Sequence, residues 1–422
     1  MRSIELKYGE GCLTFDLPEE NILQMLHSAE IEPVTNLEKA VNNCLDHPID
    51  SKPFDEIFYA GDKVTIVVSD ITRIWNKQDQ YLPFVVERLN KLGIKDEDII
   101  ILVATGTHRE GTSEEKTRLV GEDLYGRLQV IDHNCVTSEM VYVGTTPRGT
   151  EVEVNKLVVE RKTILIGGIV HHLMAGFGGG RKSIIPGVAS GKTVAQNHLN
   201  ALDPNAERSN PLIGVGVKDV NPLQLDMVDG ARLVNPDFLI NSIVDTKGNL
   251  AKLVAGHWLS AWEAGCEWAH EKFGVPIEEK ADIVIAGCGG FPKDISLYQG
   301  VKALFNAALG VKPGGTILMV AECREGAGAE AFFNWCKPLQ EGKLDTELRK
   351  NFTIPGYIFY AAVESAQNAQ VILLSSIEPS IVEPMGFAAV NTLEEALEQA
   401  DVNNPSKKVI IMPYGGSTVP IS

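Results

Sequence analysis

The sequence has fewer basic than acidic side chains, and it has no long run of apolar residues. Its 422 residues include 38 lysines and arginines against 56 aspartates and glutamates, which gives a formal net charge of −18. Because nucleic acids and anionic membranes are bound through basic side chains, this balance argues against both as partners. No stretch approaches the roughly 18 to 20 apolar residues of a membrane span, and the first residues lack the apolar run of a secretory signal. We therefore expect a cytoplasmic protein.

Cysteine pairs and complete nucleotide motifs are also missing. The seven cysteines are scattered without a CxxC pair, which predicts reduced thiols and argues against a zinc site or a disulfide framework. Residues 187–193 read GxxxGKT, one residue short of the phosphate-binding loop GxxxxGK[ST], and neither GxGxxG nor HExxH is complete. The incomplete motifs argue against a nucleoside triphosphate site and against a dinucleotide site.

Glycine, in contrast, is abundant, and many of the 39 glycines follow short runs of β-branched residues. This pattern is typical of strand-to-helix turns in α/β proteins. The predicted strands cover 64–68, 99–103, 128–131, 163–166, 283–286, 316–320, 371–374 and 409–412. The predicted helices cover 77–92, 297–309, 328–336 and 392–400.

The alternation of strands and helices predicts an α/β protein with two domains. The boundary is expected in the polar stretch near 270–280, which places the domains at 1–272 and 273–422. The C-terminal domain is predicted to hold a doubly wound, mostly parallel sheet, whereas residues 200–260 show no decided pattern. A ligand cleft between the two domains is the expectation for this architecture.

Two polar segments directly follow predicted strands, where α/β proteins bind ligands. In the segment 69–73, Arg73 is suited to grip a carboxylate or phosphate, although a capping role for Asp70 or Thr72 beside a solvated arginine is an equal alternative. In the segment 104–109, His108 is suited to move a proton near neutral pH. A histidine at such a turn is by itself more often without chemistry.

A third segment, 167–198, carries the densest set of polar residues. It combines two adjacent histidines, His171 and His172, with the sequence GFGGGRK and a further histidine, His198. Glycines let backbone amides approach a phosphate, and the lysines and arginine add positive charge to an acidic chain. We therefore favour a functional site over a flexible loop.

A fourth segment, 287–302, follows a predicted strand of the second half. If 297–309 is a helix, Tyr298, Gln299 and Lys302 can cluster on one side of it and bind an anionic substrate. A solvated lysine next to a core tyrosine is an equal alternative. The other histidines have no comparable context and are interpreted as structural or surface residues: His27, His47, His133, His257 and His270.

The ordered combination of these segments resembles the lactate racemase family. It consists of SDxTR, ATGTHR, HH followed by GFGGGRK, a histidine sixteen residues beyond that lysine, and YQGxK, over about residues 60–310. The family uses a nickel-pincer nucleotide, pyridinium-3,5-bisthiocarboxylic acid mononucleotide with nickel, which separate biosynthetic enzymes make. The resemblance implies covalent attachment at Lys182 and nickel ligation by His198, and it places the nucleotide against Gly178, Gly179, Gly180 and Arg181.

The resemblance also implies a reaction. A racemase or epimerase of this kind inverts C2 of a 2-hydroxy acid by reversible hydride transfer to the cofactor, and His108 and His172 are implied as two opposed bases. His171 is a rival to its neighbour in that role. The N-terminal domain would bind the cofactor and carry the catalytic groups, and the C-terminal domain would add substrate-binding residues. The implied substrate-binding residues are Arg73, Tyr298, Gln299, Lys302 and Asp70, and Asp70 is implied to act by orienting Arg73 or a base.

One departure from the family bears on the substrate. After Arg73 the chain continues Ile74-Trp75-Asn76-Lys77, where lactate-specific members are expected to have a proline-containing turn. Trp75 and Asn76 therefore favour a bulkier or more polar 2-hydroxy acid, such as a sugar acid, as the substrate. Lactate remains one candidate. Two other functions remain as alternatives. A nicotinamide-dependent 2-hydroxy acid dehydrogenase is disfavoured because the GxGxxG motif of a dinucleotide site is missing. A non-catalytic sensor of hydroxy acids is disfavoured because it would not need Lys182, His198 and the two proposed bases together.

Overall fold

The computed structural model describes residues 1–328 and 330–421, and the chain forms two compact units. The N-terminal unit consists of residues 30–201 and 211–271. The C-terminal unit consists of residues 1–29, 202–210 and the chain from 272 onward. Within the described residues, no helix has both the length and the apolar character that crossing a membrane requires.

The chain therefore does not divide into the two continuous segments that were predicted, 1–272 and 273–422. Strand β3 (Ile22–Met25) belongs to the C-terminal unit because it pairs in parallel with β19 (Val409–Met412). Residues 202–210 join the same unit through side chains of its helices: Glu364 accepts the backbone N–H of Ser209 at 2.7 Å, and Arg349 donates to the carbonyl of Asp203 at 2.9 Å. Neither contact is readable from local sequence patterns.

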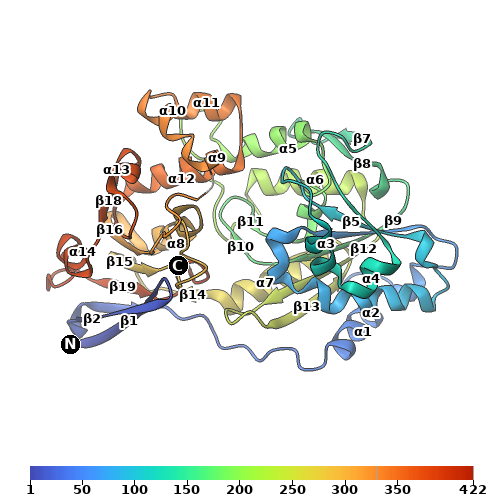
Figure 1. The fold of residues 1–422 in the computed structure, drawn as a ribbon, viewed down its shortest axis with the longest axis horizontal. Coiled ribbons are helices and arrows are strands. Elements are labelled where there is room, and N and C mark those ends of the chain that lie inside the picture. Colours follow the sequence, from blue (N-terminus) through green and yellow to red (C-terminus); the bar gives the residue numbers. More distant parts are fainter. Residues whose placement is uncertain (329, 422) are drawn as a thin grey trace. The chain divides into compact units, whose positions relative to one another are not determined.

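A six-stranded sheet forms the centre of the N-terminal unit, with the order β13-β12-β9-β4-β5-β6. Figure 1 labels β5, β9, β12 and β13 of this sheet. Neighbouring strands run parallel except β12 and β13. Most side chains of these β-branched runs are buried, as expected for a sheet that is covered on both faces. The strands are β4 (Val64–Ser69), β5 (Ile99–Ala104), β6 (Gln129–Asp132), β9 (Lys162–Gly168), β12 (Phe238–Val244) and β13 (Leu250–Gly256).

The order of this sheet reverses between β4 and β9. From β4 the chain proceeds to β5 and β6 on one side, whereas from β9 it proceeds to β12 and β13 on the other side. The connections leave these two neighbouring strands in opposite directions, so a crevice is expected beyond their carboxyl ends. The loops that follow β4, β5 and β9 are the first three polar segments of the sequence.

Helices and two small hairpins complete the N-terminal unit. The predicted helix 77–92 is α2 (Gln78–Lys91), and it buries Leu82, Val85, Val86 and Leu89 completely. The other helices are α1 (Leu37–Asp46), α3 (Ser113–Val120), α4 (Glu122–Arg127), α5 (Gly191–His198), α6 (Pro222–Val234) and α7 (Ser260–Phe273). The hairpins pair β7 (Met140–Thr145) with β8 (Glu151–Asn155) and β10 (His171–His172) with β11 (Gly176–Phe177).

A second six-stranded sheet, entirely parallel, forms the centre of the C-terminal unit, with the order β18-β17-β16-β15-β19-β3. Its order turns at β15, which confirms the predicted doubly wound sheet. The remaining strands are β15 (Ala281–Gly287), β16 (Val311–Val320), β17 (Gln370–Leu374) and β18 (Phe387–Val390). Two small pairs lie outside it: β1 (Arg2–Tyr8) with β2 (Gly11–Leu17), and β14 (Gly274–Pro276) with β20 (Val419–Ile421).

The helices of the C-terminal unit agree in part with the prediction. The helix expected at 297–309 is α8 (Leu297–Gly310), and the one at 392–400 is α14 (Leu393–Ala400). The helix expected at 328–336 overlaps two short helices and residue 329, which lies outside the described residues. The others are α9 (Glu330–Phe333), α10 (Cys336–Gln340), α11 (Leu344–Lys350), α12 (Ile354–Asn368) and α13 (Pro379–Val382).

Candidate active site

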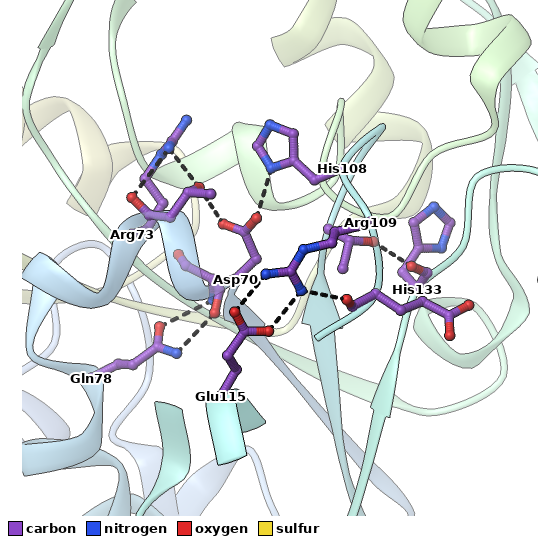
Figure 2. A network of polar contacts seen from close by, with 11 residues as sticks. Asp70, Arg73, Gln78, His108, Arg109, Glu115 and His133 are labelled. Atoms are coloured by element: carbon purple, nitrogen blue, oxygen red, sulfur yellow. Dashed lines mark hydrogen bonds and ion pairs between the residues drawn. The ribbon is translucent and has the colours of Figure 1, made fainter. Parts of the chain in front are cut away.

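Asp70 and His108 form a hydrogen-bonded pair at the carboxyl edge of the N-terminal sheet (Figure 2). The distance from Nδ1 of His108 to Oδ2 of Asp70 is 2.6 Å. The second carboxylate oxygen of Asp70 accepts the hydroxyl of Thr72 at 2.7 Å, and that hydroxyl also accepts from Arg73 at 2.8 Å. Asp70 therefore engages side chains rather than the helix backbone, which decides against the capping alternative.

The environment of Asp70 keeps its carboxylate ionised. Burial by itself raises the pKa of a carboxyl group, but the hydrogen bonds from His108 and Thr72 and the charge of Arg73 outweigh it, so the pKa of Asp70 lies below its ordinary value. The two members of the pair differ in exposure: the side chain of Asp70 is 9% exposed and that of His108 is 43% exposed. A buried acid thus orients a histidine whose ring reaches solvent.

The loop that carries His108 is fixed at both ends. Gly106 donates its N–H to the carbonyl of Gly187 at 3.0 Å. On the other side, Arg109 forms two hydrogen bonds to Glu115, at 2.6 and 2.7 Å (Figure 2). Glu115 also belongs to the capping box that begins α3, so the arginine ties the loop to a helix end.

His172 follows β9 and is held through its Nδ1 atom. This atom accepts the backbone N–H groups of Met174 at 3.1 Å and of Ala175 at 3.3 Å. Burial, followed by the nearby charges of Lys182 and Arg73, lowers the pKa of His172 well below its ordinary value. His172 is therefore neutral and lies within electrostatic reach of two of the predicted site residues.

His171, the rival of His172, makes different contacts. Its Nε2 lies 3.3 Å from Nδ1 of His270 on α7, and its ring lies 4.8 Å from that of Phe177. Burial and the neighbouring His270 lower the pKa of His171 to about 4. Successive residues of a strand point to opposite faces, which explains why the two histidines have separate partners. We retain His172 as the candidate.

The glycine-rich turn after β11 is closely packed. Gly179 and Gly180 have φ values of +72° and +55°, which favour glycine. Gly180 donates its N–H to the side chain of Asn241 at 2.8 Å, and a Cβ at this position would lie 2.5 Å from the ring of Trp262. The turn continues into a short 3₁₀ helix, Gly180–Ser183, that carries Lys182. This segment is a defined turn rather than a flexible loop.

Arg181, which the family resemblance places against the nucleotide, has partners within the chain for its guanidinium. Its side chain is fully buried, and its guanidinium lies 4.2 Å from the ring centroid of Trp262. It donates to the carbonyls of Ala175 at 2.8 Å and Gly179 at 3.1 Å, and also to the side chain of Gln224. Burial lowers the pKa of Arg181 to about 9, so it remains charged near neutrality. Arg181 therefore stabilises the glycine turn from within the unit.

Lys182 and His198 have the properties that a tether and a metal ligand need. Burial, together with the charges of Arg73 and Arg181, places the pKa of Lys182 well below its ordinary value, so its amine loses a proton more readily than that of an exposed lysine. His198 ends α5 and is 3% exposed. Its Nδ1 donates to the carbonyl of Val194 at 2.9 Å, so the lone pair of the neutral ring is on Nε2. Burial, with the charge of Lys182, lowers the pKa of His198 to about 4.

Trp75 and Asn76, the residues that depart from the family, have mainly structural contacts. Asn76 is fully buried; its Oδ1 accepts the N–H of Gln78 at 3.0 Å, and its carbonyl accepts the hydroxyl of Ser242 at 2.6 Å. A Cβ on Gly168 would lie 2.8 Å from the ring of Trp75. The side chain of Asn76 fixes the turn before α2, so any influence of Asn76 on a substrate pocket would act through the shape of this turn.

In the C-terminal unit, α8 begins after β15, at the point where the order of that sheet turns. Lys302 donates to Oε1 of Gln299 at 2.6 Å, which confirms that these two lie on the same side of the helix. The ring of Tyr298 packs edge-on against Phe332, with the centroids 5.6 Å apart. Lys302 and Gln299 can thus present an amine and an amide together.

Two family models match the chain. One describes the lactate racemase N-terminal domain and matches residues 8–209, and the other describes the lactate racemase C-terminal domain and matches residues 277–419. The lactate racemase of Thermoanaerobacterium thermosaccharolyticum is 33% identical over 431 residues, which cover 99% of each chain. The chain belongs to the lactate racemase family. It is accordingly an isomerase of the racemase type.

Further members and solved structures agree with this assignment. The lactate racemase of Lactiplantibacillus plantarum is 32% identical over 428 residues, which cover 98% of this chain and 99% of that protein. The structure of the lactate racemase apoprotein from T. thermosaccharolyticum matches with a TM-score of 0.89 at 33% identity over the full length of both chains. A crystal structure of a Thermotoga maritima protein matches with a TM-score of 0.65 at 18% identity over 93% of this chain and 99% of that one, which shows the fold alone.

Several residues that support the site had no recognisable signal in the sequence. Asn241 and Ser242 on β12 hold Gly180 and Asn76, while Gln224 on α6 and Trp262 on α7 hold Arg181. Each is at least 43 residues from its partner in the chain, and Gln224, Asn241 and Ser242 lie in the region 200–260 whose pattern was undecided. The partner could be found only from the fold.

Proposed function

We propose that the chain is a racemase or epimerase that inverts C2 of a 2-hydroxy acid with a nickel-pincer nucleotide attached at Lys182. The observation that supports it most is the Asp70–His108 pair at the reversal point of the N-terminal sheet, together with the electrostatic coupling of His172 to Lys182. The relatives named lactate racemase favour lactate as the substrate. A larger or more polar 2-hydroxy acid is proposed as the alternative because Trp75 and Asn76 follow Arg73.

The residues present fit this cofactor. Among the described residues, no group of three or more histidine, cysteine or acidic side chains is placed to hold a metal ion. A single neutral imidazole at His198 suits a nickel ion whose other donors come from the cofactor. Lys182 supplies the amine for attachment, and the turn Gly178–Gly180 supplies backbone next to it. Held by these residues, the cofactor would supply a reversible acceptor for the hydride on C2 of the substrate.

The chain's own residues bind the substrate and move its hydroxyl proton. Arg73 is exposed beside Asp70 and is suited to bind the substrate carboxylate. We propose that His108 and His172 are the opposed acid–base groups for the hydroxyl, since loss of hydride leaves a planar 2-keto acid that can accept it on either face. In the C-terminal unit, Lys302, Gln299 and Tyr298 are proposed to complete the binding of the acid.

We also propose partners and a cellular location for the protein. The cofactor must come from pincer-biosynthetic enzymes, which are the expected partners, and the setting is expected to be the cytoplasm. The N-terminal unit is proposed to bind the cofactor and to carry catalysis, and the C-terminal unit to contribute substrate contacts.

Covalent loading tests the cofactor directly. The chain is co-expressed with a pincer-synthesis system, and its intact mass, nickel content and modified peptide are measured. We expect one adduct on Lys182 with about one nickel per chain. Lys182→Ala should carry none, whereas the control Lys192→Ala should load normally because Lys192 is exposed and pairs with Glu151. An unmodified wild-type chain, from a system that loads another family member, would contradict the proposal.

The fate of the hydrogen on C2 tests the reaction. A single enantiomer of a 2-hydroxy acid carrying deuterium on C2 is incubated with loaded enzyme in ordinary water, and its product is separated by chiral chromatography. Hydride transfer predicts that the inverted product keeps its deuterium. Replacement of the deuterium by solvent hydrogen would indicate removal of a proton from carbon and would overturn the mechanism.

A further inference from the structure

Asp226 on α6 is a fully buried acid that accepts hydrogen bonds from three uncharged side chains. Its Oδ2 accepts the hydroxyl of Thr150 at 2.7 Å and the side-chain amide of Asn197 at 2.8 Å. Its Oδ1 accepts the hydroxyl of Thr146. A buried carboxyl group is tolerated only when its oxygens have such donors. Asp226 therefore joins α6 to the segments that supply them, the loop between β7 and β8 and the end of α5.

The link to α5 reaches the residue that immediately precedes His198. Asn197 is fully buried, and its amide donates to the carbonyl of Leu223 at 3.3 Å as well as to Asp226, so both acceptors are on α6. The first turn of α5 is held separately, because the hydroxyl of Thr193 donates to the carbonyl of Glu151 on β8 at 2.7 Å. The last turn of α5 is thus fastened to α6.

This fastening bears on the distance between the two residues that are proposed to hold the cofactor. The hydrogen bond from His198 to the carbonyl of Val194 lies within α5, so it holds the imidazole to its own helix but not relative to Lys182. The segment of Lys182 contacts α6 as well, because its neighbour Arg181 donates to the side chain of Gln224. Helix α6 is therefore a common support for the residues next to the tether and next to the metal ligand.

We propose that Asp226 is a positioning residue for the nickel site: through Asn197 it fixes the end of α5, and with it the imidazole of His198. The nickel part of this inference rests on the proposed function, whereas the anchoring of α5 does not. Groups that lie behind a metal ligand commonly orient it by a direct hydrogen bond. Here the orientation is set one step further away, by the contact that holds the whole helix end.

Nickel retention in the loaded protein tests this role. Variants are loaded by co-expression with the pincer-synthesis system and dialysed against graded concentrations of EDTA, and nickel per adduct is measured. Asp226→Leu and Asn197→Leu keep the size of the side chain but break the contact. We expect a normal adduct on Lys182 in both. The EDTA concentration that removes half of the nickel should fall about 10- to 100-fold, the usual effect of a change behind a metal ligand.

Thr146→Val is the matched control. It removes a different donor from the same carboxyl group and leaves the contact between Asp226 and Asn197 in place. The variant should unfold at lower urea than the wild type, because a buried hydrogen bond is lost, but it should retain nickel as the wild type does. A merely structural role of Asp226 would give all three variants the same nickel loss for the same loss of stability.

Hydrogen exchange of the unloaded protein tests the anchoring of α5 without the cofactor. Deuterium uptake is measured by mass spectrometry in peptides that cover residues 191–201. Uptake should be faster in Asp226→Leu and in Asn197→Leu than in the wild type, and unchanged in Thr146→Val. The double variant with both leucines should match Asp226→Leu alone, because the two changes break one contact.

The outcomes separate this inference from the proposed function. Nickel retention at the wild-type level in Asn197→Leu, or an equal loss in Thr146→Val, would overturn the positioning role while leaving the racemase intact. If Asp226→Leu does not fold, Asn197→Leu decides by itself. A wild-type chain that takes up no adduct would defeat the proposed function and the nickel part of this inference, and the exchange result would still decide whether Asp226 anchors α5.

Discussion

Arg181 shows how much a single buried charge can organise. Its guanidinium is fully buried, and it holds Ala175 and Gly179 on either side of the glycine turn as well as Gln224 on α6. Buried charges normally need partners, and here backbone carbonyls and an aromatic face take that place. Arg181 thus stabilises the turn that positions its neighbour Lys182.

Replacement of Arg181 by methionine should destabilise the N-terminal unit. The change leaves two buried carbonyls and the amide of Gln224 without their donor, and each such group costs about 1–3 kcal/mol. We expect a loss of at least about 2 kcal/mol in the free energy of unfolding, measured by urea titration. Arg232→Met is the control, because Arg232 is 58% exposed and pairs with Asp229 on the surface; a similar loss there would contradict the interpretation.

The pKa of His171 predicts how stability depends on pH. Its pKa falls from 6.5 to about 4 in the folded protein, so between these values the unfolded chain binds a proton that the folded chain does not. Stability should therefore be fully present above pH 6.5 and fall as the pH drops toward 4. His171→Phe, which keeps a ring beside Phe177, should show a shallower fall when melting temperatures are compared at pH 7.5 and 5. Identical slopes would contradict this.

Single residues also show what can be predicted from sequence. The positions of Arg73, His108 and His172 beyond the ends of β4, β5 and β9 could be predicted, because each lies in a segment that follows a predicted strand, and the carboxyl ends of parallel strands meet at one edge. The inward direction of Arg181 could not be foreseen, since it depends on Trp262 and Gln224, far away in the chain.

At the level of elements, the strands that were predicted contain mainly apolar residues, such as β4 and β5. Strand β12 was missed because its pattern is interrupted by Asn241 and Ser242, both fully buried. These two polar residues bond to Gly180 and Asn76, so the feature that hid the strand is one that supports the site. The polar residues that support the site therefore weaken the apolar sequence pattern by which β12 would be recognised as a strand.

The glycine turn can be tested as an element. Gly180→Ala places a Cβ 2.5 Å from Trp262 at a φ of +55°, so we expect a loss of about 2 kcal/mol or more in the free energy of unfolding. Reduced attachment of cofactor at Lys182 should accompany it. Gly126→Ala in α4 is the control, because among the described residues nothing lies within 4 Å of its added Cβ; it should be neutral or stabilising by up to about 1 kcal/mol. Equal effects would show that the turn is not tightly packed.

At the scale of the whole molecule, the alternation of strands and helices predicted both sheets, but not which parts of the chain build them. The hairpin β1–β2 contributes Ile4, Leu6, Phe15 and Leu17 to the core of the C-terminal unit. Alternation of polar and apolar residues in 2–17 indicates a strand with one buried face, but it carries no information about which sheet that face covers. Such long-range pairings come only from the three-dimensional structure.

Leu17→Ala should therefore destabilise the C-terminal unit although it lies near the start of the chain. Leu17 is fully buried, and truncation of a buried leucine costs about 2–5 kcal/mol. Trp335 lies in the C-terminal unit and the other four tryptophans lie in the N-terminal unit, so urea titration followed by ¹⁹F NMR of fluorotryptophan separates the two. The Trp335 signal should change at lower urea. Thr14→Ala, on the exposed face of β2, should have little effect, and a shift confined to the other tryptophans would contradict the assignment.

The pairing of β3 with β19 sets an order of events during synthesis. Ile22 leaves the ribosome long before its partner Val409, which lies more than three hundred residues further along the chain. The N-terminal unit has all its residues once 271 has emerged, but the C-terminal sheet lacks a strand until residues 409–412 have emerged as well. Strand β3 must therefore keep the edge that pairs with β19 open while more than three hundred further residues are translated, which makes β3 a natural place for a chaperone to bind.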